Sequence, residues 1–191
     1  MLQPQHITEY FIERYIKPDD IAVDATAGNG HDTAKLCRAV GKNGKVYAFD
    51  IQNKAIENTR KLLKEEGLEN ATLIQASHSD MDKYITESVK AVLFNLGYLP
   101  GGDHNLQTKY TTTLPAIEKS LEMISDDGFV SVTIYYGKNS GTVEKDMVME
   151  YLKGICHKRF TVTIHDFYNR PNNPPITAII TKNVIQKNSN T

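Results

Sequence analysis

The chain has 191 residues, of which 40% are hydrophobic and 24% charged, and its formal net charge at pH 7 is −1. This length suits one folded domain over residues 1–191, with an N-terminal helix within residues 1–18 and a frayed tail over residues 183–191. The balanced charge argues against nucleic-acid binding over the whole surface but leaves room for a local basic patch. No apolar run is long enough to cross a membrane and the first residues lack a signal-peptide pattern, so we expect a cytoplasmic location and no membrane partner.

The two cysteines, Cys37 and Cys156, both fall inside expected helices. They show no metal-type spacing, and neither do the histidines His104, His157 and His165. We therefore expect two buried free thiols and no bound metal.

Strand and helix patterns alternate along the chain. Amphipathic spacing and capping residues predict helices over residues 6–15, 32–40, 53–67, 108–125 and 142–157, with a short helix capped by Ser79 or Asp80. Apolar runs between turn signals predict strands over residues 21–25, 45–50, 71–76, 90–95, 129–136, 160–167 and 177–182. A polar loop over residues 97–107 follows the fourth strand.

This order predicts an α/β fold built on a seven-stranded, doubly wound sheet. The sheet is expected to be mostly parallel with an antiparallel last strand, because the final two strands follow one another without a helix. Right-handed crossovers bring the carboxyl ends of the first four strands to one edge, which is where ligands bind in open α/β sheets.

The most informative segment is a glycine turn at the end of the first expected strand. It reads D-x-T-x-G-x-G-x-D-T from Asp24 to Thr33, and a second acid, Asp50, closes the next strand. Glycines let a backbone approach a nucleotide-like ligand, and an acid after the second strand is placed to hold a ribose hydroxyl. The dinucleotide motif G-x-G-x-x-G is not matched, and Asp32 would repel a pyrophosphate. A cationic ligand suits this turn better, which points to S-adenosylmethionine.

Several residues at this edge are candidates for cofactor binding. The residues are Asp24, Thr26, Gly28, Gly30, Asp32, Asp50, Gln52, Ser77, His78 and Asn95. Simpler explanations remain open for some of them: the glycines punctuate a strand–helix junction, Asp32 suits a helix N-terminus, Gln52 suits the surface, and Ser77 suits a helix cap.

The stretch from Asn95 to Tyr98, Asn-Leu-Gly-Tyr, ends the fourth strand. It resembles the N/D-P-P-Y/F motif of amino methyltransferases, with Leu-Gly in place of Pro-Pro. The resemblance implies that the Asn95 amide oxygen accepts a hydrogen bond from the nucleophilic amine and that Tyr98 stacks on the substrate base. Methyl transfer depends mainly on such alignment, because a sulfonium is already a good leaving group. A loop asparagine and a packed tyrosine are the alternative.

Other polar residues are placed to face a substrate on the same edge. Tyr135 and Lys138 follow the fifth strand, while Tyr168 and Arg170 lie between the last two strands. The cations could contact phosphate and Tyr168 could stack on a base. A solvated loop without a ligand accounts for these residues equally well.

Taken together, the glycine turn, the stretch from Phe49 to Gln52 and the block from Asn95 to Asp103 resemble a small bacterial family over nearly the whole chain. That family was first labelled rRNA methylases and is now assigned as tRNA 5-aminomethyl-2-thiouridine methyltransferases. The resemblance implies a Rossmann-like class I fold, S-adenosylmethionine as the methyl donor, and the anticodon stem-loop of tRNA as partner, with the wobble uridine as target. It also implies that Asn29 lines the cofactor.

Three other functions stay open from the sequence. They are methylation of rRNA or of a small amine, a nicotinamide oxidoreductase, and a non-catalytic RNA-binding protein with a relic cofactor fold. The first methylates a different substrate, the second binds a nicotinamide cofactor in place of S-adenosylmethionine, and the third predicts no methyl transfer. A homodimer is a further expectation, because a small domain facing a large RNA could use a second subunit to widen its basic surface.

Overall fold

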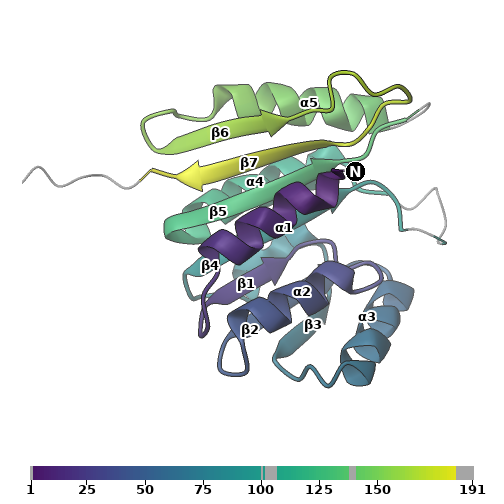
Figure 1. The fold of residues 1–191 in the computed structure, drawn as a ribbon, viewed down its shortest axis with the longest axis vertical. Helices are drawn as coiled ribbons and strands as arrows, with labels where there is room; N and C mark the ends of the chain where they lie inside the picture. The colour runs from purple at the N-terminus through teal and green to yellow at the C-terminus, as the bar shows by residue number, and fades with distance from the viewer. Residues whose placement is uncertain (1, 100, 102–106, 138–140, 184–191) are drawn as a thin grey trace, which may run out of the picture.

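The computed structural model describes residues 2–99, 101, 107–137 and 141–183. Its centre is a seven-stranded sheet with the strand order β3-β2-β1-β4-β5-β7-β6 (Figure 1). The strands are β1 (Ile21–Asp24), β2 (Lys45–Asp50), β3 (Ala71–Gln75), β4 (Val89–Leu96), β5 (Ile124–Ile134), β6 (Phe160–His165) and β7 (Ile176–Lys182). The helices are α1 (Pro4–Tyr15), α2 (His31–Val40), α3 (Asn53–Glu65), the short 3₁₀ helix η1 (His78–Lys83), α4 (Tyr110–Met123) and α5 (Gly141–Gly154).

The predicted direction of the strands is confirmed. Neighbouring strands from β3 to β5 pair in parallel, whereas β7 pairs antiparallel with both β5 and β6. Figure 1 shows β6 and β7 running in opposite directions. Because β7 lies between β5 and β6, the loop over residues 166–175 returns to the same edge as the end of β5, where Ile134 pairs with Ile176.

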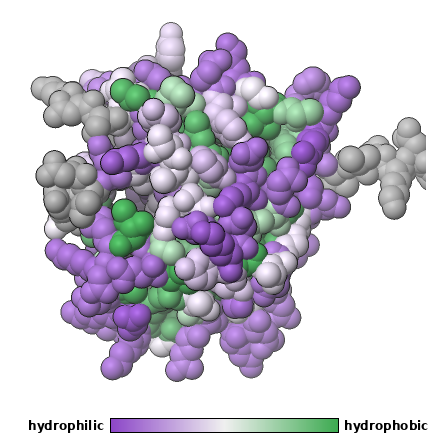
Figure 2. Space-filling view, turned by 180° about the vertical axis from the view of Figure 1, so that it is seen from behind, coloured by the Kyte–Doolittle hydropathy of each residue, from purple (hydrophilic) through white to green (hydrophobic). Residues whose placement is uncertain are grey.

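Side chains along each strand point alternately to the two faces of the sheet, so apolar residues on both faces are covered by helices. On one face α1, α2 and α3 bury residues such as Ala22, Val46 and Leu93. On the other face η1, α4 and α5 bury Val23 and Phe94. Figure 2 looks onto the second face from outside, where hydrophilic side chains cover most of the surface with smaller apolar areas between them. The apolar core is therefore enclosed between the two layers of helices and the sheet.

Some predicted boundaries are wrong in the second half of the chain. Helix α4 ends at Met123 because the buried Ile124 already belongs to β5, ahead of the expected turn over residues 126–128. The pairing of β4 with β5 then shifts register between Val89 and Ala91. Helix α5 ends at Gly154, so Cys156 lies outside it.

The thiol and capping predictions are confirmed only in part. Both cysteines are free; Cys37 is buried as expected, but Cys156 is exposed. Asn53 does not cap α3, because Gln52 holds that position and the Asn53 amide donates instead to Glu57. The cap of η1 is Ser77 rather than Ser79 or Asp80, since its hydroxyl accepts from the Ser79 amide.

Only the first residue of the expected tail, Asn183, lies within the described residues. Asn183 is tied to the fold, because its backbone N–H donates to the Arg159 carbonyl and its side chain bonds Thr161 and His157. The rest of the expected tail, residues 184–191, lies outside the described residues. Among the described helices none is long and apolar enough to cross a membrane. The same part of the chain holds no group of three or more residues suited to bind a metal.

Candidate active site

The glycine turn links the end of β1 to the start of α2 and rests on α3. Gly28 and Gly30 have φ angles of 55° and 88°, in the left-handed region that side chains disfavour. A Cβ built on Gly30 would lie 2.8 Å from the Cα of Thr59, and the Thr59 hydroxyl donates to the Gly28 carbonyl at 3.2 Å. Asn29 accepts from the Asn58 amide at 2.9 Å. The two glycines thus allow a close contact that fixes the shape of the turn.

Asp24 lies under this turn and is fully buried. One carboxylate oxygen accepts from the Thr33 hydroxyl at 2.6 Å and the other from the Thr26 backbone at 3.1 Å. Burial, and after it the nearby charge of Asp32, raises the pKa of Asp24 to about 7, although the two hydrogen bonds oppose this shift. Asp50 contributes a smaller effect in the same direction. Three acids therefore meet beneath the turn, and their combined field favours a cation there.

Asp50 ends β2 and ties it to the turn. Its oxygens accept from the backbone N–H groups of Gly28 at 3.0 Å and Gln52 at 2.9 Å. Burial raises the pKa of the Asp50 carboxyl, and these backbone hydrogen bonds oppose the shift. A carboxylate has about four acceptor positions, so Asp50 keeps capacity for the hydroxyls of a ribose.

The segment after β3 presents Ser77 at the edge but not the ring of His78. The His78 imidazole is buried, with Nδ1 3.2 Å from the Ala25 carbonyl oxygen and its ring edge-on to Phe94. Its Nε2 is buried without a hydrogen-bond partner, and burial lowers the pKa of the ring. Only the backbone of His78 and the side chain of Ser77 are thus placed for the predicted contacts with an adenine.

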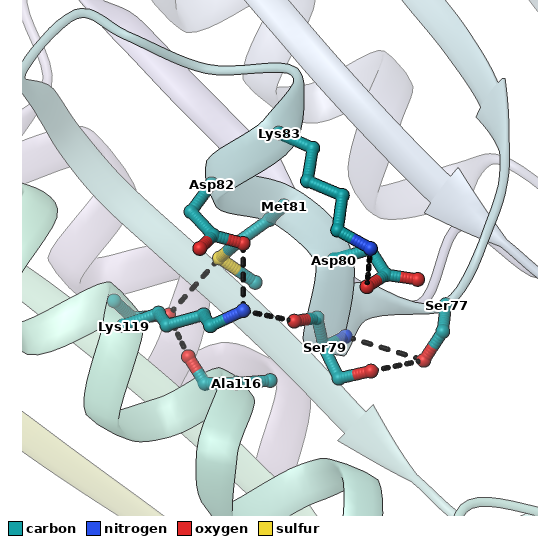
Figure 3. A network of polar contacts seen from close by, with 9 residues as sticks. Ser77, Ser79, Asp80, Met81, Asp82, Lys83, Ala116 and Lys119 are labelled. Carbon is teal, nitrogen blue, oxygen red and sulfur yellow. Dashed lines mark hydrogen bonds and ion pairs between the residues drawn. The ribbon is translucent and has the colours of Figure 1, made fainter.

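Helix α4 holds this segment in place (Figure 3). The Lys119 ammonium donates to the Ser79 carbonyl at 2.5 Å and to Asp82 at 2.6 Å, while the Ser120 hydroxyl contacts the Met81 sulfur. Figure 3 also shows the ion pair of Lys83 with Asp80 along η1. The position of Ser77 therefore depends on packing between η1 and α4.

Asn95 lies near the end of β4, beside the glycine turn. Its backbone N–H donates to the Thr26 hydroxyl at 2.7 Å, and its side-chain Nδ2 donates to Asp32 at 2.8 Å. Asp32 in turn accepts from Lys35 at 2.9 Å. The structure thus brings three predicted residues, Thr26, Asp32 and Asn95, into one hydrogen-bonded group.

Tyr98 begins the loop that leaves β4, and its side chain is 49% exposed. A bridge between Tyr98 and Gln107 closes this loop at its base. Next to the bridge, the Gly97 N–H donates to the Thr108 hydroxyl at 2.9 Å, and the Gly97 carbonyl accepts from the Thr108 N–H. The start of the loop is therefore fixed to the residues before α4.

Glu144 at the start of α5 has a structural role that the sequence analysis did not predict. It is buried and accepts from two hydroxyls, Thr108 at 2.6 Å and Thr113 at 2.7 Å. Through Thr108 it supports the turn at Gly97, two residues from Asn95. A glutamate on an amphipathic helix looks in sequence like a solvated charge, and only the two facing threonines, 36 and 31 residues away, show otherwise.

The predicted substrate residues are spread along the remaining edge. A Cβ built on Gly97 would lie 3.3 Å from the Tyr135 Cβ, and partial burial of Tyr135, with the nearby Asp32 charge, raises the pKa of its hydroxyl. Tyr168 is fully exposed, whereas the Arg170 guanidinium donates to the Leu2 carbonyl at 2.6 Å and stacks on Phe167. Arg170 is therefore partly committed to the N-terminus. The prediction for Lys138 lies outside the described residues.

Comparisons with known proteins now bear on the family. Residues 46–181 match a family model described as "Putative rRNA methylase". The chain belongs to this family. A crystal structure from Clostridium thermocellum, named as an rRNA-methylase of this type, is 47% identical with a TM-score of 0.94, covering 96% of this chain and 99% of the other. A Streptococcus mutans structure, named as a methyltransferase and solved in complex with S-adenosylhomocysteine, is 37% identical with a TM-score of 0.88 over 96% and 99% of the two chains.

A curated relative from Arabidopsis thaliana extends the comparison to a named reaction. It is called a chloroplastic tRNA (mnm(5)s(2)U34)-methyltransferase and is 35% identical over 170 residues, which is 83% of this chain. The chain spans 62% of that relative's length. The predicted family resemblance and the fold of a class I methyltransferase are confirmed, and the predicted cofactor agrees with the product bound in the S. mutans relative. The roles of individual site residues stay predictions.

Proposed function

We propose that this chain transfers a methyl group from S-adenosylmethionine to the exocyclic amine of 5-aminomethyl-2-thiouridine at the wobble position of tRNA. The observation that carries the proposal is the placement of Asn95, whose backbone and side chain are both held beside the glycine turn while Tyr98 stands exposed three residues on. The name of the Arabidopsis relative supports the substrate, and the S. mutans complex supports the cofactor.

The residues present fit the cofactor by their chemistry. Asp50 has acceptor capacity for the ribose, and Asp24 beneath the turn suits a ligand that carries a sulfonium and an ammonium group. Gly28 lets the backbone approach, with Leu99 3.5 Å from the position that a Cβ would take. When bound, S-adenosylmethionine supplies an electrophilic methyl group on a good leaving group.

The contribution of the protein is alignment and proton handling. In the transfer, a new N–C bond forms as the C–S bond breaks, its electron pair stays on sulfur, and the substrate ammonium gives up one proton. Asn95 Oδ1 accepts from the amine and directs its lone pair, which is the geometric contribution that catalysis by orientation requires. A free alkylamine is protonated near neutral pH, so it must lose a proton before it can attack the methyl group. Burial of the amine disfavours its charged form and therefore supports this loss.

The test measures two quantities on three variants. Asn95→Ala is expected to lower the methyl-transfer rate at least roughly 100-fold while the Kd for S-adenosylhomocysteine changes less than about threefold. Asp50→Ala is expected to raise that Kd roughly 10- to 100-fold, because a charged hydrogen bond contributes about 1.5–3 kcal/mol. The control is Asn53→Ala on the exposed start of α3, which leaves both quantities unchanged.

The substrate is tested on tRNA from cells that lack the gene. Purified protein and S-adenosylmethionine are added, and the nucleosides are separated by mass spectrometry. We expect 5-methylaminomethyl-2-thiouridine to appear; methylation of rRNA alone, or of free amines alone, would contradict the proposal. A homodimer and a cytoplasmic location stay predictions, the first of which light scattering tests.

A further inference from the structure

The contact between Asn95 and Asp32 joins residues 63 positions apart in the sequence, on β4 and α2. An asparagine amide has an accepting oxygen and a donating NH₂ group, and the two ends are nearly the same size. A carboxylate offers acceptors only. Asp32 therefore selects one orientation of the Asn95 amide, with Nδ2 toward α2 and Oδ1 turned the other way.

Asp32 is itself held by a chain of charges that begins on α1. The Lys35 ammonium lies 2.9 Å from Asp32 and 2.8 Å from Glu9. Burial of Lys35 alone would lower its pKa, but the contacts with Glu9 and Asp32 outweigh burial and raise it. The Lys35 ammonium stays charged and holds Asp32 through Oδ1, while the Asn95 amide donates to Oδ2.

We propose that Asp32 is a positioning residue, which keeps the Asn95 amide in the one orientation that presents Oδ1 to the substrate amine. The proposal rests on the proposed function of Asn95. Without Asp32, the amide is free to turn and present its NH₂ group, which would donate to the amine lone pair that has to attack the methyl group. Misalignment at a reacting group can cost roughly 100-fold in rate.

This role differs from direct contact with the cofactor, which the sequence predicts for Asp32. A cofactor ligand contributes to the Kd for S-adenosylhomocysteine. A positioning residue contributes to the rate of the bound complex. The experiment therefore measures single-turnover methyl transfer at saturating S-adenosylmethionine and, separately, the Kd by calorimetry, with a thermal unfolding curve for each variant.

A reciprocal exchange of the two side chains gives the decisive result. In Asn95→Asp two carboxylates would face each other at the position of the present 2.8 Å contact, so we expect a rate loss of at least roughly 100-fold at pH 8. Adding Asp32→Asn places an amide donor on α2 opposite the new carboxylate on β4. The second oxygen of that carboxylate is left to accept from the substrate amine. We expect the double variant to recover to within about tenfold of the wild-type rate.

Single variants complete the design. Asp32→Ala is expected to lower the rate roughly 10- to 100-fold, with the Kd changed less than about threefold. The matched control is Glu65→Ala, because Glu65 forms an exposed i,i+4 pair with Lys61 on α3. It is expected to keep the wild-type rate.

Each failure has its own meaning. A double variant no faster than Asn95→Asp, or a full rate for Asp32→Ala, overturns the positioning role. A raised Kd with an unchanged rate also overturns it and makes Asp32 a cofactor ligand. A full rate for Asn95→Ala overturns the proposed function itself, whatever Asp32 does.

Discussion

The two halves of the carboxyl edge of the sheet are built in different ways. From β1 to β3, side chains and backbone satisfy one another: Asp24 accepts from Thr33 and Thr26, and Asp50 accepts from Gly28 and Gln52. Beyond Asn95 the edge carries exposed rings, with Tyr98 49%, Tyr135 46% and Tyr168 100% exposed.

This difference separates two kinds of binding. The first half is preorganised, so a small ligand would lose little free energy in ordering it. The second half offers flat aromatic faces to solvent, which suits a large partner with unstacked bases. Asn95 lies where the two halves meet, and through Asp32 it belongs to the preorganised half.

The rigid half depends most on Gly30. In Gly30→Ala the new Cβ would lie 2.8 Å from Thr59, with the backbone at a φ of 88°. Left-handed strain of about 1–2 kcal/mol and overpacking of about 1–3 kcal/mol predict a loss of about 2–5 kcal/mol in the free energy of unfolding. Urea denaturation measures it.

The matched control for this variant is Gly67→Ala. Gly67 has a φ of 66°, but no atom lies within 4 Å of the position that a Cβ would take there. It should lose only the strain, about 1–2 kcal/mol. Equal losses for the two variants would show that the turn does not rely on contact with α3.

The buried acid of the same half predicts a dependence on pH. The pKa of Asp24 is about 7 in the folded protein, against an ordinary value of 3.8. The folded state therefore binds this proton more tightly than the unfolded state, and the free energy of unfolding falls as pH rises from about 4 to about 7. The fall attributable to Asp24 is at most about 4 kcal/mol, and above pH 7 it levels off.

Asp24→Asn removes this titration and should flatten the pH profile of stability between pH 4 and pH 7. The measured quantity is the change of the free energy of unfolding with pH and not its value at one pH, because the amide alters the hydrogen bonds to Thr33 and Thr26. Asp126→Asn, at a carboxylate that is 82% exposed, serves as the control and should follow the wild type. A parallel profile for Asp24→Asn would mean that burial does not perturb Asp24.

The sequence predicted the rigid half better than the open half. Asp24, Gly28 and Asp50 follow from a rule of topology, since the ends of parallel strands meet at one edge. The contact of Asp32 with Asn95 does not follow from any local pattern, because it depends on how α2 packs over β4. Glu144 was missed for the same reason.

Local signals also failed where burial overrode them. His78 reads as a polar residue at a strand end, but the turn that begins at Ser77 directs its ring into the core against Phe94. The boundary at Ile124 moved because a buried apolar residue joined the sheet before the Asp-Asp-Gly signal. Local sequence propensity favours a structure for each segment, but packing in the folded protein decides where its side chains and boundaries lie.

The open half should respond in substrate binding and not in stability. Tyr168→Ala removes a fully exposed ring, so the free energy of unfolding should change by less than about 0.5 kcal/mol. If the ring stacks on a base, KM for tRNA should rise roughly fivefold, equivalent to about 1 kcal/mol, with no change in the Kd for S-adenosylhomocysteine. Tyr10→Ala, at an exposed tyrosine on α1, is the control. An unchanged KM would leave Tyr98 and Tyr135 as the aromatic contacts, and would move the RNA-facing part of the edge toward β4 and β5.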